Sequence, residues 1–403
     1  MASSRSPSEA VVERRPLAGA RPALALVALA VVAFNLRTPT ASLPPLLGNV
    51  QGALGLSGAA TGLLTALPVL CMALCAPAAQ RLAHRVGRET ATLWAIGLVA
   101  AGTLLRLGGG AAGVLYAGTL VAGIGIAVSG VTLPGIVKAR FPHRPGAATA
   151  VYSVPMMLGA AVAPSLAVPL ARSLGSWQAS LASWSVPALL AAVLWAPLAR
   201  GARRPVDTAA GPLPWGSRSA WLLAGFLSVQ SILAYAYLAW LAPAYESRGW
   251  PAERTGALLG VLHLAQLATA LALPPLADRS RDRRPLLLAS VTCTVVGAGV
   301  LFAAPGAAPW AATVVLGLGL GGGFSLALVV MADLAASPAA AARLAAMTFL
   351  LCYSAASLAP VAIGAIHDAT GGYALPFAAL TLVAGIELAL ATRLRPALRS
   401  TVS

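Results

Sequence analysis

Arg37 is a single charged residue about two thirds of the way along the first long apolar segment of the chain. If that segment crosses a membrane, an unpaired arginine at this depth is unfavourable by about 2.5–3.5 kcal/mol on insertion scales. No carboxylate lies at a comparable depth in the other apolar segments, because the acids in or next to them lie at segment ends or in the cytoplasmic half of the last one (Asp333, Asp368, Glu246 and Glu387). The planar fork of a guanidinium suits a carboxylate or a linear anion. We therefore expect Arg37 to bind an anionic or electron-rich ligand in a cavity; the alternative is a side chain that reaches outward or pairs structurally.

Further polar side chains lie inside apolar segments. Asn35 is two residues before Arg37, about 200° away on a regular helix, so both face one cavity only if Pro39 disturbs the helix. Gln230 and Tyr237 are seven residues apart in another segment and therefore share a stripe of a helix. Their amide and phenol groups suit ligand binding and hydrogen bonding between helices equally well.

His263 and Gln266 are three residues apart in the next segment and also share a helix face. His263 is the only mid-segment group that titrates near neutral pH, so it is a candidate carrier of a coupling proton. The alternative is a hydrogen-bonded packing residue. Tyr152 and Tyr353 occupy corresponding places in the two halves of the chain and are candidates for lining a cavity, although aromatic residues in such places also serve packing.

The composition is typical of a protein whose surroundings are membrane lipid. Of the 403 residues, 59% are apolar and 9% are charged, whereas about 25% of the residues of a soluble domain are charged. The apolar residues form segments of roughly 20, each long enough to cross about 30 Å of hydrocarbon. A net charge of +16 is also typical of nucleic-acid binding, but the 27 basic residues lie in short clusters between apolar segments. We therefore predict an integral membrane protein with no nucleic-acid partner.

The segments predict an all-α protein of about 12 transmembrane helices. The expected spans lie near 22–45, 57–80, 90–107, 112–137, 146–171, 178–199, 219–242, 254–277, 285–304, 309–332, 343–366 and 375–393. An even number of spans puts both termini on one side, which carries 22 of the basic residues. The other side carries only Arg106, Arg172, Arg248 and Arg254. The positive-inside rule then predicts a multi-pass protein of the cell membrane with both termini cytoplasmic.

The longest polar segment between spans divides the chain into two halves. We expect a tail at 1–21, a six-helix bundle at 22–199, a linker at 200–218, a second six-helix bundle at 219–393 and a tail at 394–403. Gly123-x-Gly125 in the fourth span matches Gly317-x-Gly319 in the tenth at a shift of 194 residues. Ala- and Gly-rich helices also align by chance, but two other matches have nearly the same shift. Two pseudo-symmetric bundles around a central cavity are the arrangement of transporters that work by alternating access.

Neither the cysteines nor the glycines form a recognised chemical motif. Cys71, Cys75, Cys293 and Cys352 all lie inside apolar segments, without the spacing of a metal or redox site, and buried cysteines usually serve packing. The glycine-rich run 317–323 lacks the preceding strand and the lysine of a phosphate-binding loop. We therefore expect no metal, no cofactor and no enzymatic activity.

The loop after the eighth span begins Ala277-Asp278-Arg279, and it resembles the cytoplasmic Asp- and Arg-rich motif of the major facilitator superfamily. The resemblance implies a conformational latch that pairs across the bundle and separates when the halves rock. The corresponding loop of the first half has His84 where that family usually has Asp. The expected latch residues are Asp278, Arg279, Arg283, Arg284, Arg85 and Arg88.

Within that superfamily, residues 21–393 most resemble the cyanate porter and nitroimidazole transporter family. Asn35-Leu36-Arg37 followed by Pro39 is similar to the Asn-Leu-Arg-Pro signature of that family, with Thr38 displacing the proline by one position. The resemblance implies a monomeric secondary active transporter that moves a small polar or anionic solute across the cytoplasmic membrane by rocker-switch alternating access. The alternative is drug or antibiotic efflux by a multidrug-type exporter, which usually uses a larger apolar cavity and a membrane-embedded acid.

Overall fold

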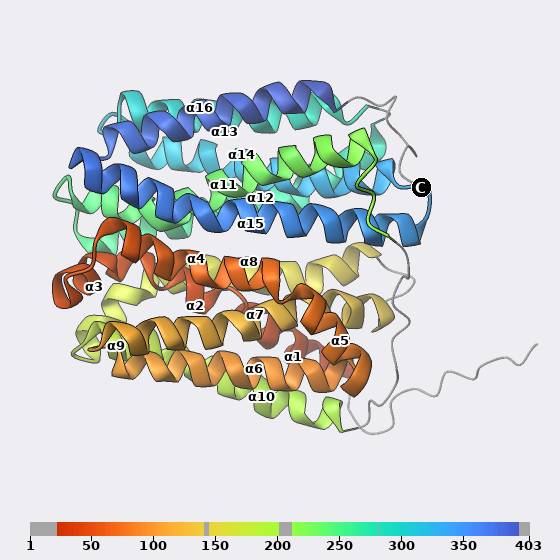
Figure 1. The fold of residues 1–403 in the computed structure, drawn as a ribbon, viewed down its shortest axis with the longest axis horizontal. Helices are drawn as coiled ribbons and strands as arrows, with labels where there is room; N and C mark the ends of the chain where they lie inside the picture. Colours follow the sequence, from red (N-terminus) through yellow and green to blue (C-terminus); the bar gives the residue numbers. More distant parts are fainter. Residues whose placement is uncertain (1–21, 141–144, 201–211, 281, 395–403) are drawn as a thin grey trace, which may run out of the picture.

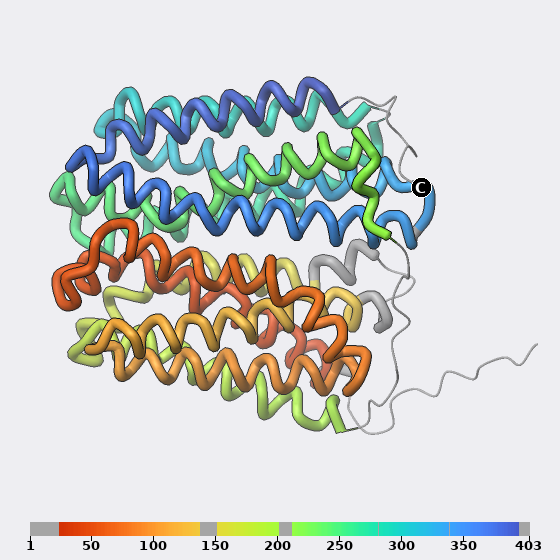
Figure 2. The backbone as a smooth tube through the Cα atoms, in the orientation of Figure 1, coloured from red at the N-terminus to blue at the C-terminus, as the bar shows by residue number. Residues whose placement is uncertain are grey.

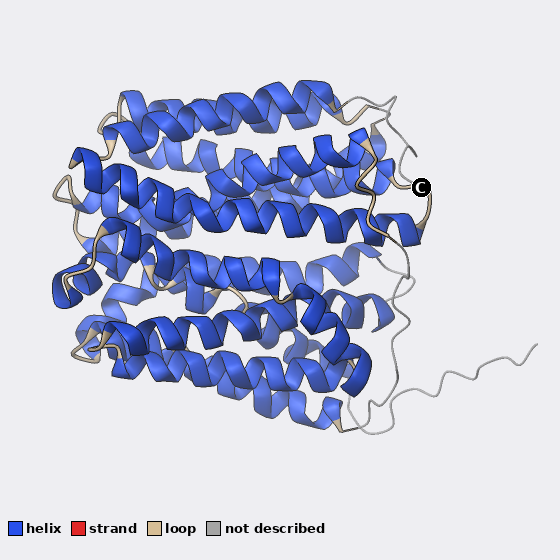
Figure 3. Ribbon diagram, in the orientation of Figure 1, coloured by secondary structure: helices blue, strands red, loops and turns tan. Residues whose placement is uncertain are grey.

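The computed structural model describes residues 22–140, 145–200, 212–280 and 282–394, and these ranges contain helices and no β-strand (Figure 3). The first half holds α1 (Pro22–Asn35), α2 (Thr38–Ala41), α3 (Leu47–Leu54), α4 (Gly58–Leu74), α5 (Ala76–Val86), α6 (Arg88–Leu105), α7 (Ala112–Arg140), α8 (Pro145–Ser173), α9 (Trp177–Ser183) and α10 (Ser185–Ala199), with short 3-10 helices at Pro44–Leu46 and Arg106–Gly108. The second half holds α11 (Arg218–Glu246), α12 (Ala252–Arg279), α13 (Arg284–Ala303), α14 (Pro309–Leu334), α15 (Pro338–Thr370) and α16 (Ala374–Arg393).

Eleven segments of the described chain are long and apolar enough to span a membrane. The helices α4 and α5 meet at a bend of 56° and make a twelfth span when they are counted together. This confirms the predicted all-α membrane fold with about twelve spans. The expected tail at 1–21, residues 395–403 of the expected tail at 394–403, and residues 201–211 of the expected linker lie outside the described residues.

The helices form two groups that lie side by side. In Figure 1, α1 to α10 (red to yellow-green) form the lower group and α11 to α16 (green to blue) the upper one. Each group has its own apolar core, with Trp195 fully buried in the first and Trp240 in the second. The main contacts between the groups join α4 to α15 and α8 to α12. We call the side where α10 ends and α11 begins the linker face, and the side of the loops 55–57, 174–176, 247–251 and 371–373 the loop face.

The first span is broken in its middle. A proline has no N–H to donate and its ring clashes with the carbonyl group four residues earlier. The helix α1 ends at Asn35, four residues before Pro39, and α2 begins at Thr38. Arg37 lies in this break as the residue that precedes α2. Arg37 therefore lies between two helices, so the geometry of one continuous helix does not fix the direction of its side chain.

The two halves approach each other very closely toward the loop face, where α4 runs beside α15 (Figure 2). A Cβ atom added at Gly62 of α4 would lie 2.3 Å from the carbonyl oxygen of Pro360 on α15. In the related pair α8 and α12, a Cβ atom at Gly256 would lie 2.3 Å from the carbonyl oxygen of Pro164. Only glycine permits backbone contact this close, as is common between membrane helices.

Candidate functional site

Arg37 bridges the two halves. Its Nη1 donates a hydrogen bond to the hydroxyl oxygen of Tyr235 on α11 at 3.0 Å, and its Cζ lies 5.8 Å from the centre of the Tyr235 ring. Arg37 forms no ion pair with any acidic side chain among the described residues. The side chain is half-buried. A cation in the middle of a span therefore has a neutral phenol as its polar partner on the opposite half.

Aromatic and apolar side chains surround this pair. Tyr235 belongs to a cluster that both halves share, made of Ala41, Val69, Ala163 and Trp184 from the first half and Leu238 and Ala356 from the second. The rings of Phe34 and Trp184 lie next to each other, with centroids 6.4 Å apart. Trp184 is buried, and its indole N–H has no hydrogen-bond acceptor among the described residues. The cluster therefore holds a donor group that lacks an acceptor among the described residues.

Tyr353 and Tyr152 lie near this cluster. Tyr353 packs against it and stacks on Phe349, with ring centroids 5.7 Å apart. It lies within electrostatic range of Arg37, Tyr235 and Tyr152. Tyr152 packs against the core of the first half. The structure thus brings three residues from the sequence analysis, Arg37, Tyr152 and Tyr353, into one neighbourhood.

His263 on α12 is also within electrostatic range of Arg37. Its side chain is buried, and Nδ1 lies 2.8 Å from the carbonyl oxygen of Leu259, one turn earlier in the same helix. A carbonyl oxygen can only accept, so Nδ1 carries the hydrogen in this bond. Half of the hydrogen-bonding capacity of the imidazole is therefore used within its own helix.

Asn35 forms its hydrogen bonds within the first half, although the first span is broken directly after it. Its side chain is fully buried, and Nδ2 donates to the carbonyl oxygens of Val31 at 2.8 Å and of Pro187 on α10 at 3.1 Å. Both acceptors belong to the first half. Asn35 therefore joins two helices of one bundle in this conformation.

Gln230 and Tyr237 lie inside the second bundle. Gln230 is almost completely buried, and its Nε2 donates to the carbonyl oxygen of Leu320 on α14 at 2.6 Å. Tyr237 is fully buried, and its ring centre lies 5.7 Å from that of Phe377. The half-buried Gln266 brings its backbone against α14. In this conformation these three residues contact helices of their own half.

Arg106 begins the short 3-10 helix after α6, inside the span expected near 90–107, and the sequence analysis counted it on the side opposite the termini. Its side chain is only 1% exposed. Its Nη1 donates to the carbonyl oxygen of Pro39 at 2.6 Å, and Nε and Nη2 have no partner among the described residues. The break in the first span frees backbone carbonyl groups, and Arg106 binds one of them two residues after Arg37.

The expected latch residues of the second half contact that half alone. Arg283 forms an ion pair with Asp333, with Nε and Oδ2 3.3 Å apart, and its Nη1 donates to the carbonyl oxygens of Ala277 and Ser280. Arg284 donates to the carbonyl oxygen of Thr392 at 3.0 Å. Asp278 and Arg279 are exposed at the linker face.

The expected latch residues of the first half behave in the same way. Arg85 is exposed, and Nη1 of the half-buried Arg88 lies 3.5 Å from the carbonyl oxygen of Gly135 on α7. None of the hydrogen bonds that the six latch residues make within the described ranges joins one half to the other.

Besides the Arg37–Tyr235 hydrogen bond, polar contacts between the halves are found at the loop face. The carboxylate of Asp368, near the end of α15, accepts hydrogen bonds from the backbone N–H groups of Gly58 at 2.8 Å and Ala59 at 2.9 Å. These groups begin α4, where unpaired N–H groups and the helix dipole favour a negative charge. Arg172 of α8 and Glu253 of α12 form an ion pair across the other interface. The structure therefore shows a conformation that is closed at the loop face.

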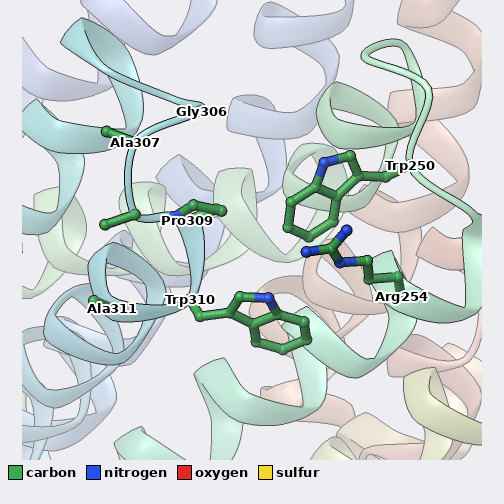
Figure 4. A pocket seen from close by; sticks show the side chains of 8 residues that line it. Trp250, Arg254, Gly306, Ala307, Pro309, Trp310 and Ala311 are labelled. Carbon is green, nitrogen blue, oxygen red and sulfur yellow. The ribbon is translucent and has the colours of Figure 1, made fainter.

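A pocket of about 560 Å³ lies at the loop face of the second half (Figure 4). It is lined by Trp250, Arg254, Trp310 and the loop before α14, and the Cζ atom of Arg254 lies 3.8 Å from the centre of the Trp250 ring. The pocket contains none of the polar residues that the sequence analysis selected. It is separate from the Arg37 cluster between the halves.

Sequence reasoning missed Tyr235 and Trp184 as parts of the site. Tyr235 and Tyr237 are two residues apart and so face opposite sides of α11, but that helix is buried on most of its surface and its sequence does not show which side faces the other half. Trp184 lies between α9 and α10, where the sequence suggested one continuous span. Only the structure shows that the span is broken at this position.

Comparisons with known proteins agree with this arrangement. Residues 25–360 match the family model described as the Major Facilitator Superfamily. The chain is 32% identical to the 2-nitroimidazole transporter of Escherichia coli (strain K12), covering 91% of this chain and 94% of the relative. It is 32% identical to the uncharacterized transporter YycB of Bacillus subtilis (strain 168), covering 87% and 88%, and 29% identical to the cyanate transport protein CynX of Escherichia coli (strain K12), covering 88% and 92%.

Solved structures share the fold. A bacterial homologue of the human lysosomal transporter Spinster matches with a TM-score of 0.76 and 16% identity, covering 94% of this chain and 99% of that one. A D-xylose-proton symporter matches with a TM-score of 0.75 and 13% identity, covering 91% and 96%. The family match covers most of the chain. The relatives are named as transporters, and the similarity extends over 88–94% of their length. The chain therefore belongs to the Major Facilitator Superfamily and is a secondary transporter of small solutes.

Proposed function

We propose that the solute binds between the two halves, at Arg37, Tyr235, Trp184 and Tyr353, and that it is a small anion or a compact, electron-rich polar molecule. The observation that carries this proposal is the guanidinium of Arg37 in the middle of the protein with a phenol, not a carboxylate, as its partner. A neutral partner leaves the positive charge uncompensated, so a bound anion gains a charge-assisted hydrogen bond. The free indole N–H of Trp184 supplies a second donor.

The names of two relatives support this class of solute. Cyanate is a small linear anion, and the nitro group of a 2-nitroimidazole has oxygen atoms that accept hydrogen bonds. Both fit a site that offers donors next to aromatic rings. In the same proposal, Tyr152 and His263 border the site, whereas Asn35, Gln230, Tyr237 and Gln266 act on it through the helices that they join.

Uptake into proteoliposomes tests the class of solute. We expect the purified protein to take up labelled cyanate or labelled 2-nitroimidazole in a saturable way. We expect no saturable uptake of a lipophilic cation such as tetraphenylphosphonium, because Arg37 repels it. Saturable uptake of the cation alone would contradict the proposal and favour multidrug efflux.

We further propose that the linker face is cytoplasmic in the plasma membrane and that Asp278, Arg279 and the neighbouring arginines close this face in another conformation. Asp278 and Arg279 are exposed here, so they are available to pair with the first half when the halves rock. Their bonds would then replace those that Asp368 makes at the loop face. Among the described residues, more arginines lie at the linker-face ends of the helices than at the loop-face ends, as the positive-inside rule requires of a cytoplasmic side.

Cysteine labelling in intact cells tests this orientation. In a cysteine-free background, a membrane-impermeant maleimide should label Arg248→Cys at the loop face in intact cells. The same reagent should label Arg279→Cys at the linker face only after the cells are permeabilised. Labelling of Arg279→Cys in intact cells, with the variant still able to transport, would reverse the orientation.

A further inference from the structure

Glu387 on α16 is a buried acid that the solute site does not use. Its side chain is completely buried, and neither carboxylate oxygen has a hydrogen-bond partner within the described part of the chain. By its sequence position, Glu387 lies in the half of α16 that ends at the linker face. Its burial inside the second bundle is a feature that only the structure reveals.

The carboxyl group lies where α16 meets α14 and α11. One of its oxygens, Oε1, is 3.4 Å from the position that a Cβ atom would take at Gly323. The Cγ atom of Gln230 and the Cζ atom of Phe226, both on α11, lie 3.7 Å and 4.0 Å from the same position. The missing side chain of Gly323 thus leaves the space that the carboxyl group, the glutamine and the phenylalanine share.

No cation of the described chain compensates Glu387. The helices that pack against α16 are α11, α13 and α15, and α14 is in contact through Gly323. In their linker-face halves, α11 and α13 carry the titratable or charged groups Arg218, Arg284 and Cys293. In the same halves, α14 and α15 carry Asp333, Arg343, Cys352 and Tyr353. None of these groups forms a hydrogen bond or an ion pair with Glu387.

An ionised carboxylate without a partner or water is very unfavourable inside a membrane protein, whereas a neutral carboxylic acid costs far less. We propose that Glu387 is a proton-binding site: it holds a proton in the conformation that is closed at the loop face and exchanges it with water when the halves rock. The step is simple protonation, in which one proton from water on one side of the membrane joins the carboxylate and later leaves to the other side.

Gln230 supplies a way to stabilise the ionised state. Its amide now donates to the carbonyl oxygen of Leu320, and its side chain lies beside Glu387. A turn of the amide toward the carboxylate would give the charge a donor in the other conformation. The role of the proton as the ion that drives solute transport rests on the proposed function, but proton binding at Glu387 does not.

Infrared spectroscopy tests proton binding without any solute. At neutral pH, wild-type protein in lipid should show the carbonyl stretching band of a protonated carboxyl group, which is distinct from carboxylate bands. Glu387→Gln should lose this band, and the control Glu253→Gln should keep it, because Glu253 is paired with Arg172. A wild-type spectrum without the band, or a Glu387→Gln spectrum that keeps it, would overturn the proposal.

Transport of labelled 2-nitroimidazole or cyanate tests the coupling role. We expect Glu387→Gln to keep solute exchange at equal pH within about threefold of wild type and to lose the accumulation that a proton gradient drives. Accumulation by Glu387→Gln equal to that of wild type would refute coupling through this residue. If the infrared band behaves as expected but neither solute is transported, the choice of solutes is wrong and the proton site stands.

Discussion

Replacing Arg37 with alanine should abolish transport of a small anion, with a fall in kcat/KM of at least about a hundredfold. The variant loses the only cation that the described structure places between the halves next to the shared aromatic cluster. Arg37→Lys keeps the charge but not the planar fork of donors, so we expect a smaller loss of about tenfold, mainly in KM. Initial rates of uptake of labelled cyanate or 2-nitroimidazole into proteoliposomes measure both effects.

Arg218→Ala is the matched control, because Arg218 is exposed at the linker-face end of α11 and its loss should leave uptake unchanged. Removal of the Arg37 charge should not prevent folding, since an unpaired arginine in a span is unfavourable for insertion. A folded Arg37→Ala protein with unchanged KM and kcat would show that the solute does not contact Arg37.

Replacing Gly62 and Gly256 with alanine should stop transport by preventing closure of the loop face. A Cβ atom at either position would lie 2.3 Å from a backbone carbonyl oxygen of the opposite half, and backbone atoms cannot move aside as a flexible side chain can. The double variant should therefore favour the conformation that is open at the loop face and transport at least about tenfold more slowly. It should still bind solute, because the atoms nearest to the two added Cβ atoms belong to Pro360, Val361, Pro164 and Pro45, and not to Arg37 or Tyr235.

Gly225→Ala is the control for this experiment, because a Cβ atom at Gly225 meets nothing within 4 Å. A cysteine at Ser357, one turn from Pro360 on the same face of α15, reports on closure. Wild type and Gly225→Ala should protect Ser357→Cys from an impermeant maleimide, whereas the double variant should expose it. Equal protection in all three proteins, with normal transport, would contradict the close packing seen here.

The sequence was sufficient to predict the number and places of the spans. Each span needs about twenty apolar residues to cross the hydrocarbon, and that requirement is visible as hydropathy. It also predicted that Arg37 is exceptional, because a mid-span charge is costly wherever the helix points. Pro39 was recognised as a residue able to break the first span, and the break is where the proline places it.

The directions in which side chains point inside the bundles could not be predicted from the sequence. Tyr237 was selected because it shares a stripe with Gln230, but the residue that reaches Arg37 is Tyr235, on the other side of α11. A helix that is apolar all round shows no difference between its faces, so either choice was compatible with the pattern. Arg106 was counted only by the side of the membrane on which it lies, and the structure shows that its buried guanidinium binds the carbonyl oxygen of Pro39.

A structure of the protein with bound cyanate or 2-nitroimidazole tests the central claim most directly. We expect ligand density between the halves, within hydrogen-bond distance of the Arg37 guanidinium and beside the rings of Tyr235 and Trp184. Density for the ligand only in the loop-face pocket formed by Trp250, Arg254 and Trp310, with the space around Arg37 empty, would contradict it.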